Sequence, residues 1–600
     1  MNQPSPALVA QSAVRRLPRW ALLLLCAAYI VPGYVGRNPW KSIDIAAFGV
    51  MRELAAAPHW QAWLVPAMGQ QYDAALLPYW IGAWALQLTG GWVAPELAVR
   101  LPFMLMLAGT LAAVWGAVAH LARHPGAQPV AFAFGGEADP ASYARALADG
   151  ALLALIATFG LAQFSHETAL ALAQLFCSAL LFYGLAALPL KPGTGLSAAA
   201  LGLVGLALSG ASGIALIIGV IVTAGLLRRV RHGQMAIGVA GDLPTNWRVA
   251  AFVTLLIATA ACALLAWQLN GWHWSVALPQ RWVVWRDRIK LLVWFTWPAW
   301  PLVLWTLWRW RRQMLAPNQN WHLSLPVMLA CVPLVAAVLT PVADRCLLLA
   351  LPGLAALAAF ALPTFKRSGA AFIDWFTVLF FTGCAIFIWV MWIATLTGFP
   401  PQPAANVARL APGFHQQWQW PGFVAALAGT LAWVAIVHWR AGRHRAALWK
   451  SLVLPASGAT LCWLLLMTLW LPAFDYARSY APQMQQVRAV IGAGAPCVSV
   501  QGLTSAQITA LRFHGGWVTV PLSMPRTCPW LVRNAWGQRR FEASPQGQSW
   551  QRIIDIRRPT DSSETLAVYR RSQAAPDATV LEAPGPAAAP AQSANPDLAR

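Results

Sequence analysis

The stretch that decides the fold is WALLLLCAAYIVPGYVGRNPWKSIDIAAFG, residues 20–49. Its first half is an almost unbroken apolar run, with the length and composition of a membrane-spanning helix. Soon after the run ends comes an acid, Asp44, in a chain of 600 residues that has only 20 acids. The stretch predicts a first membrane span and raises the question of why a carboxylate lies just beyond it.

The apolar pattern recurs along most of the chain. Hydrophobic residues make up 58% of it and charged residues only 10%, whereas soluble proteins carry about 25% charged residues. We therefore expect a polytopic α-helical membrane protein. The predicted spans are thirteen, at about 18–35, 99–121, 149–164, 168–189, 196–209, 211–227, 249–267, 289–309, 325–340, 346–363, 371–397, 422–440 and 451–473.

The basic residues test this topology. The formal net charge is +22, and cytoplasmic loops of membrane proteins carry an excess of Lys and Arg. With the N-terminus in the cytoplasm, the cytoplasmic loops hold the clusters Arg228, Arg229 and Arg231, then Arg309, Arg311 and Arg312, then Lys366 and Arg367, then Arg440, Arg443, Arg445 and Lys450. The run at 76–88 is interpreted as an interfacial helix, because a span there would invert every later loop. The topology explains the basic charge without any nucleic acid.

Three regions follow from this topology. Residues 1–473 form a transmembrane domain with an outside loop at 36–98, and residues 474–572 form a small outside α/β domain with strand-like runs at 497–503, 517–522 and 565–571. The Ala/Pro-rich tail at 573–600 is expected to be disordered. Cys497 and Cys528 both fall in the outside domain, where an oxidising compartment favours a disulfide between them, although the sequence leaves both states open.

Two acids near the outer face stand out. Seven acids lie in or beside outside loops, namely Asp44, Glu53, Asp73, Glu96, Glu167, Asp287 and Asp344. Some of them simply neighbour a base, as Glu53 follows Arg52. Asp44 and Glu167, the latter in FSHETAL (164–170), are flanked by apolar sequence with no adjacent base. Because ionisable groups beside a membrane are costly, we predict that both face a cavity.

Tryptophan is abundant, with 35 residues, most of them near span ends. Indoles favour the membrane interface, so an aromatic belt is one interpretation. The loop 268–288 combines Trp272, Trp274, Trp282 and Trp285 with Arg281, Arg286 and Arg288. A carbohydrate platform that includes Trp274 and Arg281 is the other interpretation.

The order of these motifs resembles a known family, the bacterial integral-membrane C-type glycosyltransferases of the aminoarabinose-transferase and protein O-mannosyltransferase kind. The similar elements are, in chain order, Asp44, Arg52-Glu53, Trp60, Tyr72 with Pro78-Tyr79-Trp80, Arg100-Leu101-Pro102, Glu167, the turn at 209–213, WFTWPAWPLVL (294–304) and DRCLLLALPGLAAL (344–357). The resemblance covers about residues 18–473. Two lysines that the family carries are absent, because the chain reads Ala74-Ala75-Leu76 and SGASG (209–213) at those places.

The resemblance implies a reaction and a location. Such enzymes transfer a sugar from a polyprenyl (undecaprenyl) phosphate carrier to an acceptor, which is lipid A, another glycan or a protein. The site would face the periplasm from a bacterial inner membrane, with the N-terminus in the cytoplasm and the C-terminus in the periplasm. The alternative is a non-catalytic transporter, flippase or assembly protein of a cell-envelope pathway. The chain shows no internal repeat and no mid-span acids of the kind that secondary transporters use.

The resemblance also implies roles for single residues. Asp44 would accept the acceptor proton, and Arg345, with Arg52 and Arg100, would bind the departing phosphate. A structural role at a span entrance is equally open for Arg100. For Glu167 the sequence leaves two roles open: it would orient the acceptor, or it would help to hold a divalent metal ion. A divalent metal ion is the one cofactor that the sequence leaves open. Tyr72, Tyr79 and His166 are expected to line the substrate cavity.

Overall fold

The computed structural model describes residues 5–63, 75–232, 245–269, 280–315, 320–340, 343–365, 367–441, 447–524 and 528–572. The chain divides into two compact units. The first comprises Met1–Pro482 with Ser505–Ala510, and the second comprises Gln483–Thr504 with Leu511–Arg600. The second unit thus begins at Gln483 rather than at Phe474, because the short helix α20 (Leu471–Arg478) belongs to the first.

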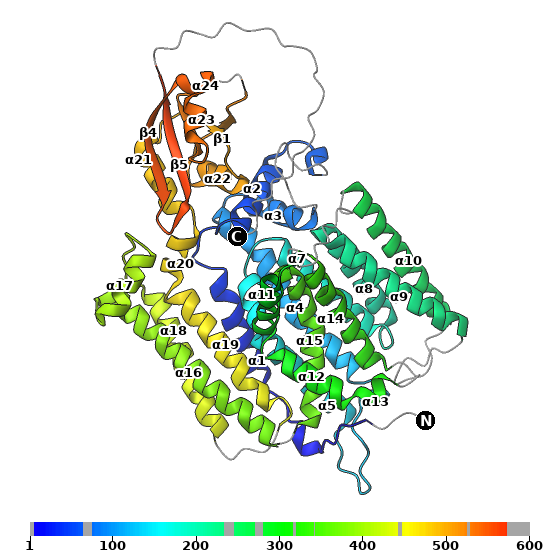
Figure 1. Cartoon of the computed structure of the whole chain (residues 1–600). Coiled ribbons are helices and arrows are strands. Elements are labelled where there is room, and N and C mark those ends of the chain that lie inside the picture. The colour runs from blue at the N-terminus through cyan, green and yellow to red at the C-terminus, as the bar shows by residue number, and fades with distance from the viewer. Residues whose placement is uncertain are drawn as a thin grey trace. The chain divides into compact units, whose positions relative to one another are not determined.

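The first unit is a helix bundle (Figure 1). Its long or paired helices are α1 (Arg19–Ile30), α4 (Pro95–Leu121), α5 (Pro140–Ala157), α6 (Phe159–Phe164), α7 (Leu170–Ala187), α8 (Pro192–Leu206), α9 (Ser212–His232), α10 (Thr245–Gln268), α11 (Trp282–Phe295), α12 (Ala299–Arg309), α14 (Trp321–Leu339), α15 (Ala343–Ala361), α16 (Arg367–Thr397), α18 (Trp420–Ala441) and α19 (Lys450–Thr468). Each predicted span corresponds to one of these helices or to a consecutive pair of them. The multi-pass membrane fold expected from the apolar pattern is therefore confirmed.

Nine helices of the described part are long and apolar enough to cross a membrane, or ten if the bent pair α11–α12 counts as one span. Thirteen spans were predicted, and the difference has identifiable causes. Helix α1 is short, and α5 is broken from α6 at Thr158. Helices α8 and α9 count as one continuous run, although Gly210, with φ of 89°, turns the chain between them. Leu203 lies against Gly219 across this turn, so the two helices fold back on each other.

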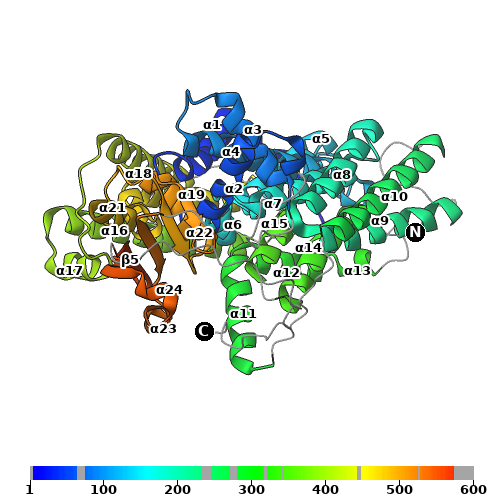
Figure 2. The same ribbon diagram turned by 90° about the horizontal axis from the view of Figure 1, so that it is seen from above.

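One predicted span is not straight. The expected span at 289–309 is divided into α11 and α12, which meet at an angle of 87° (Figures 1 and 2). The break falls at Thr296–Pro298, where a proline lacks the backbone N–H that a continuous helix needs. Pro298 was the sequence signal for this bend.

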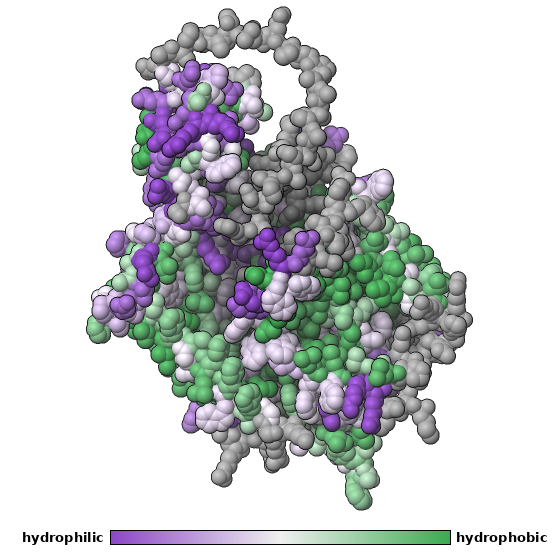
Figure 3. Space-filling model, in the orientation of Figure 1, coloured by the Kyte–Doolittle hydropathy of each residue, from purple (hydrophilic) through white to green (hydrophobic). Residues whose placement is uncertain are grey.

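The core of the bundle is α15, because 94% of the most apolar 18-residue stretch of Asp344–Thr364 is buried. It packs against α5, α7, α12 and α14. On the view of Figure 3, hydrophobic residues cover most of the side of the bundle. Such a surface belongs in lipid rather than in water.

The bundle has two distinct ends. At one end lie α2 (Ile43–Ala56), α3 (Leu77–Thr89) and α20, where the backbone at Trp40 bridges that at Ser479. We call this the α2 end. At the opposite end, the N-terminal segment pairs with the loop after α4, as in the bridge between Ala10 and Glu137. Helix α3 has 13 residues and packs on α2 and α4.

The second unit contains a five-stranded sheet in the order β2-β1-β3-β5-β4. Strands β1 (Val498–Gln501), β2 (Thr519–Pro521) and β3 (Trp530–Asn534) are parallel, whereas β4 (Trp550–Arg558) and β5 (Asp561–Arg571) pair antiparallel at one side. Helices α21 (Ala481–Ile491), α23 (Gln538–Glu542) and α24 (Pro545–Gln548) complete it. Hydrophilic residues cover much of its visible surface in Figure 3.

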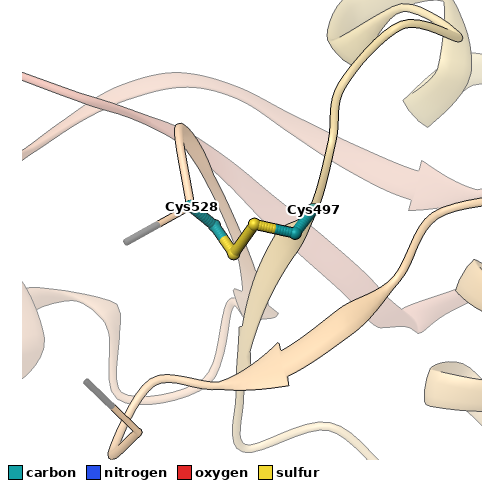
Figure 4. Close-up of a disulfide and its surroundings, with 2 residues drawn as sticks. All are labelled: Cys497 and Cys528. Atoms are coloured by element: carbon teal, nitrogen blue, oxygen red, sulfur yellow. A yellow bond between two sulfur atoms is a disulfide. The ribbon is translucent and has the colours of Figure 1, made fainter. Parts of the chain in front are cut away.

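A disulfide joins the two cysteines of this unit that the sequence singled out (Figure 4). Cys497 precedes β1 and Cys528 precedes β3, and their Cα atoms are 5.4 Å apart. Both are buried. The bond therefore joins two neighbouring parallel strands at their starting ends.

Candidate active site

Asp44 is the centre of a buried polar network at the α2 end. It lies in the first turn of α2 and is only 2% exposed. Its Oδ2 accepts hydrogen bonds from Arg37 Nη1 at 2.9 Å and from the Trp40 amide at 3.0 Å. Its Oδ1 accepts from the Thr168 amide at 3.0 Å and from the Thr168 hydroxyl. A carboxylate offers about four acceptor positions, so all of them are used.

Asp44 connects helix α2 to a distant turn of the chain. An acid in the first turn of a helix is favoured by the partial positive charge of the helix N-terminus. Through Thr168, the same carboxylate reaches the Ser165–Ala169 turn between α6 and α7. Asp44 therefore joins α2 to a turn that lies 124 residues further along the chain.

Arg37 is the partner that the sequence analysis missed. Asp44 has no adjacent base in the sequence and was expected to face a cavity; the structure contradicts that expectation, because Asp44 is buried and Arg37, seven residues earlier, pairs with it. Arg37 also donates to Gly33 O at 3.0 Å through Nε and to His166 O at 2.6 Å through Nη2. The only signal in the sequence was a lone Arg between the first span and the lone acid.

The charges around Asp44 set its ionisation. Burial by itself raises the pKa of the Asp44 carboxyl, but Arg37, Arg100, the Thr168 hydroxyl and the Trp40 amide together hold it below its usual range. Asp44 is therefore a carboxylate at neutral pH, and its proton-accepting positions already have donors.

Glu167 immediately precedes Thr168 and behaves in the opposite way. Its side chain is partly buried, and that burial raises its pKa to about 7. The charge of Asp44 contributes to this pKa of about 7, whereas Arg37, Arg478 and Arg345 act against the rise. A carboxyl that ionises near neutral pH is suited to general acid–base chemistry.

Trp40 is in contact with two guanidinium groups and a second acid. The Cζ atoms of Arg37 and Arg478 are 4.4 Å and 5.3 Å from its ring centroid. Its indole N–H donates to Asp475 Oδ1 at 3.0 Å, and Asn38 donates to the same carboxylate through its amide N–H and its side chain. The segment 37–40 is thus held by two carboxylates, Asp44 and Asp475.

Arg100 and His166, two of the predicted site residues, are packed into this framework. Arg100 is 2% exposed and donates to Arg37 O at 2.6 Å and to Tyr34 O at 3.4 Å, which fits the structural role left open for it. The His166 ring packs 4.4 Å from that of Trp463, and its Nε2 lies 3.0 Å from Tyr29 O. Burial lowers the pKa of His166 to about 3, so the ring is neutral.

The other predicted residues are spread apart. Arg345 lies partly buried in the first turn of α15, close enough to Glu167 to influence it. Tyr79 is buried in α3, Arg52 is exposed on α2, and Arg281 is exposed just before α11. Tyr72 and Trp274 lie outside the described residues.

A cavity of about 340 Å³ opens beside Trp40 and Arg478. Apart from these two residues its lining is almost wholly apolar and comes from α5, α6, α16, α19 and α20. It shares Phe159 and Phe381 with two further cavities, of about 520 Å³ and 290 Å³. We call the three together the side groove.

The side groove is long. Its lining residues on α16 run from Phe372 to Ile388, and at 1.5 Å per residue this corresponds to about 24 Å along the helix. That length is most of the hydrocarbon thickness of a bilayer, about 30 Å. The groove therefore offers an apolar path along the bundle that ends at a cation, Arg478.

Within the described ranges, no three His, Cys, Asp or Glu side chains are grouped so that they could hold a metal ion. The metal ion that stayed possible for Glu167 has no donor set there. The functional groups described at the α2 end of the bundle are therefore carboxylates and guanidinium groups.

No protein-family model and no curated protein sequence matches the chain. Two solved structures do share its fold. One is ArnT from Cupriavidus metallidurans bound to undecaprenyl phosphate, with 16% identity, coverage of 93% of this chain and 99% of that chain, and a TM-score of 0.57. The other is the same protein in the apo state, with 16% identity, coverage of 92% and 98%, and a TM-score of 0.54. The prediction from the motifs is confirmed at the level of the fold: this chain has the polytopic membrane fold of ArnT, an aminoarabinose transferase of the C-type glycosyltransferase class.

Proposed function

We propose that this protein is a membrane glycosyltransferase that moves a sugar from a polyprenyl-phosphate carrier to an acceptor hydroxyl. Two observations carry the proposal together: Arg478 lines one end of the side groove, and Glu167, whose pKa is raised to about 7, lies close enough to Arg478 and Arg345 for their charges to act on it. The reaction needs three parts: a proton acceptor, cations that bind the phosphate, and an apolar path for the lipid tail of the carrier. The shared fold with a protein that binds undecaprenyl phosphate supports the same carrier.

The side groove suits a lipid-linked donor. A polyprenyl tail is apolar and long, and the groove is lined by rings and aliphatic chains such as Phe159, Phe381 and Leu466. Arg478 lies at the mouth of the groove beside Trp40. A guanidinium group can bind a phosphate through two parallel hydrogen bonds, so Arg478 is our candidate for holding the donor phosphate.

The reaction uses these groups in one step. The acceptor oxygen attacks the anomeric carbon of the sugar, and the bond from that carbon to the phosphate oxygen breaks. The acceptor proton passes to the Glu167 carboxylate, and polyprenyl phosphate leaves with the electron pair. Arg478 and Arg345 stabilise the negative charge that develops on the phosphate, which is the usual use of fixed cations in group transfer.

In this scheme Asp44 positions the site and does not accept the proton. Its acceptor positions already have donors in Arg37, Trp40 and Thr168. It holds the turn that carries Glu167, and its charge raises the pKa of Glu167. The base expected from the family resemblance thus moves from Asp44 to Glu167.

The location proposed with this function is a bacterial inner membrane with the α2 end in the periplasm. The Arg-rich loops Arg309–Arg312 and Arg228–Arg231 then face the cytoplasm, in agreement with the positive-inside rule. The acceptor, whether lipid A, another glycan or a protein, would enter from the periplasmic side.

The test is sugar transfer by the full-length protein in membranes. Radiolabelled undecaprenyl-phosphate sugars are the donors, and endogenous membrane glycans, lipids and proteins are the acceptors. Glu167→Gln should lower the rate about 10²–10⁴-fold, as loss of a general base does. Glu137→Gln, at the opposite end of the bundle, is the matched control and should transfer at the wild-type rate.

A second pair of variants tests the phosphate site. Arg478→Gln should weaken donor use about 10–100-fold, because a hydrogen bond to a charged group contributes roughly 1.5–3 kcal/mol. Arg409→Gln changes an exposed arginine of α17 (Pro401–Leu410) that does not line the groove and should have no effect. Absence of transfer from every donor by the wild type would contradict the proposed class and favour a transport or assembly role.

A further inference from the structure

Helix α11 leaves the bundle sideways. It turns by 87° from α12, which itself packs along the buried α15. Figure 1 views α11 end-on, and Figure 2 shows it projecting away from the other helices. It packs on α6 and α15.

Two contacts fix the level of α11 along the bundle. The ring of Phe295 packs 6.0 Å from that of Phe164, the last residue of α6. The Arg288 guanidinium donates to the carbonyl of Val338 in the last turn of α14. Both neighbours lie where helices end at the α2 end of the bundle. Helix α11 therefore lies at the level of the membrane surface, across the direction of the spans.

The surface of α11 combines exposed aromatic, aliphatic and charged groups. Trp282 is 74% exposed and Trp294 is 59% exposed. At 100° per residue, Arg286, Asp287 and Lys290 share an arc of about 100° with the exposed Val283 and Trp294, whereas Val284 and Leu292 fall on the other side. In water such exposed indoles and valines would be costly, but at a lipid interface indoles are favoured.

The charge on α11 is strongly unbalanced. Four cations occur between residues 281 and 290, against one acid, Asp287. The pair between Arg286 and Asp287, at 3.5 Å, has both side chains about three-fifths exposed, and exposed pairs of this kind contribute little. The helix therefore presents a net positive strip that also carries exposed apolar and aromatic groups.

We propose that α11 lies in the headgroup layer of the membrane at the α2 end and binds the phosphates of anionic phospholipids. The cationic strip faces the phosphates, and Val284 and Leu292 face the acyl chains. Arg and Lys near an anionic leaflet are attracted by about 1 kcal/mol each.

The carbohydrate-platform interpretation of this region stays a prediction. Trp272 and Trp274 lie outside the described residues, and Trp282 and Trp285 point in directions about 60° apart around the helix axis.

The first test measures lipid preference of the full-length protein in nanodiscs of phosphatidylcholine mixed with phosphatidylglycerol. Native mass spectrometry counts the lipids retained after mild release from the disc. The double variant Arg286→Gln with Lys290→Gln should lower retention of phosphatidylglycerol about fivefold for each cation removed. The control, Arg539→Gln with Arg540→Gln, removes two exposed cations from α23 of the second unit and should keep the wild-type preference.

The second test does not depend on charge variants. A photo-crosslinking benzoylphenylalanine at position 284 should form adducts with phospholipid acyl chains in the same nanodiscs, and the same residue at position 518, exposed in the second unit, should not. An unchanged lipid preference in the α11 variant, an equal loss in the control, or the absence of lipid adducts at position 284 would each overturn the proposal. None of these readouts uses sugar transfer.

Discussion

Replacing Glu167 by Gln should stabilise the protein at alkaline pH while it removes transfer. The pKa of Glu167 is raised from 4.5 to about 7, chiefly because the side chain is buried. An acid with a raised pKa in the folded state favours folding only while it is protonated. Stability is therefore full below pH 4.5, falls between pH 4.5 and pH 7, and is constant above. At 1.36 kcal/mol per pH unit, the loss amounts to about 3 kcal/mol.

The amide of Gln carries no charge at any pH, so the variant should avoid this loss. Unfolding by sodium dodecyl sulfate in mixed micelles, followed by tryptophan fluorescence, measures the free energy at pH 4.5 and at pH 8. The variant should gain about 3 kcal/mol over the wild type at pH 8 and close to nothing at pH 4.5. Glu137→Gln is the control and should show no such pH dependence. An equal effect of Glu167→Gln at both pH values would refute the burial argument.

Four further outcomes are expected. Asp44→Asn alone should cost about 3–5 kcal/mol because it leaves a buried arginine uncompensated, whereas Arg37→Met combined with Asp44→Leu should unfold close to the wild-type midpoint. Asp44→Asn should also move the acid limb of the pH–rate profile to lower pH, since the Asp44 charge raises the pKa of Glu167. Mercurial labelling of Cys462, which lines the groove, should be slowed by undecaprenyl phosphate and unaffected by a short-chain phosphate, as read from peptide mass spectra. Gly210→Ala should cost about 1–2 kcal/mol in the same unfolding assay, because φ there is 89°.

The membrane helices were largely predictable because their signal is local. A run of about 20 apolar residues needs no information from the rest of the chain, and the basic clusters fix alternate loops. The bend between α11 and α12 had a local signal too, in Pro298, but the length of the apolar run concealed it. Strand β4, in contrast, is an edge strand with mostly exposed residues, among them Arg552 and Arg557, so it lacks the apolar alternation that identifies a strand.

The site was predictable only in part because it is assembled from distant segments. The acids Asp44 and Glu167 were recognisable as isolated charges in apolar sequence. Nothing local indicated that Thr168 would use both its donors on Asp44, or that Arg478 would lie over Trp40. These contacts join residues more than a hundred positions apart, so they depend on the packing of whole helices and not on the motifs around them.

The two acids illustrate how a fold separates the roles of like groups. Asp44 receives four hydrogen bonds and the charge of Arg37, and these lower its pKa although it is the more deeply buried. At Glu167, close to Asp44, burial raises the pKa by more than the nearby cations lower it, so the pKa rises to about 7. In many enzymes, two neighbouring titratable groups whose pKa values are shifted in opposite directions have different roles in the reaction. Here the permanent charge of the first is one cause of the basicity of the second. In the proposed reaction Asp44 therefore acts through Glu167, whereas Arg37 keeps Asp44 ionised and itself acts against the rise in the pKa of Glu167.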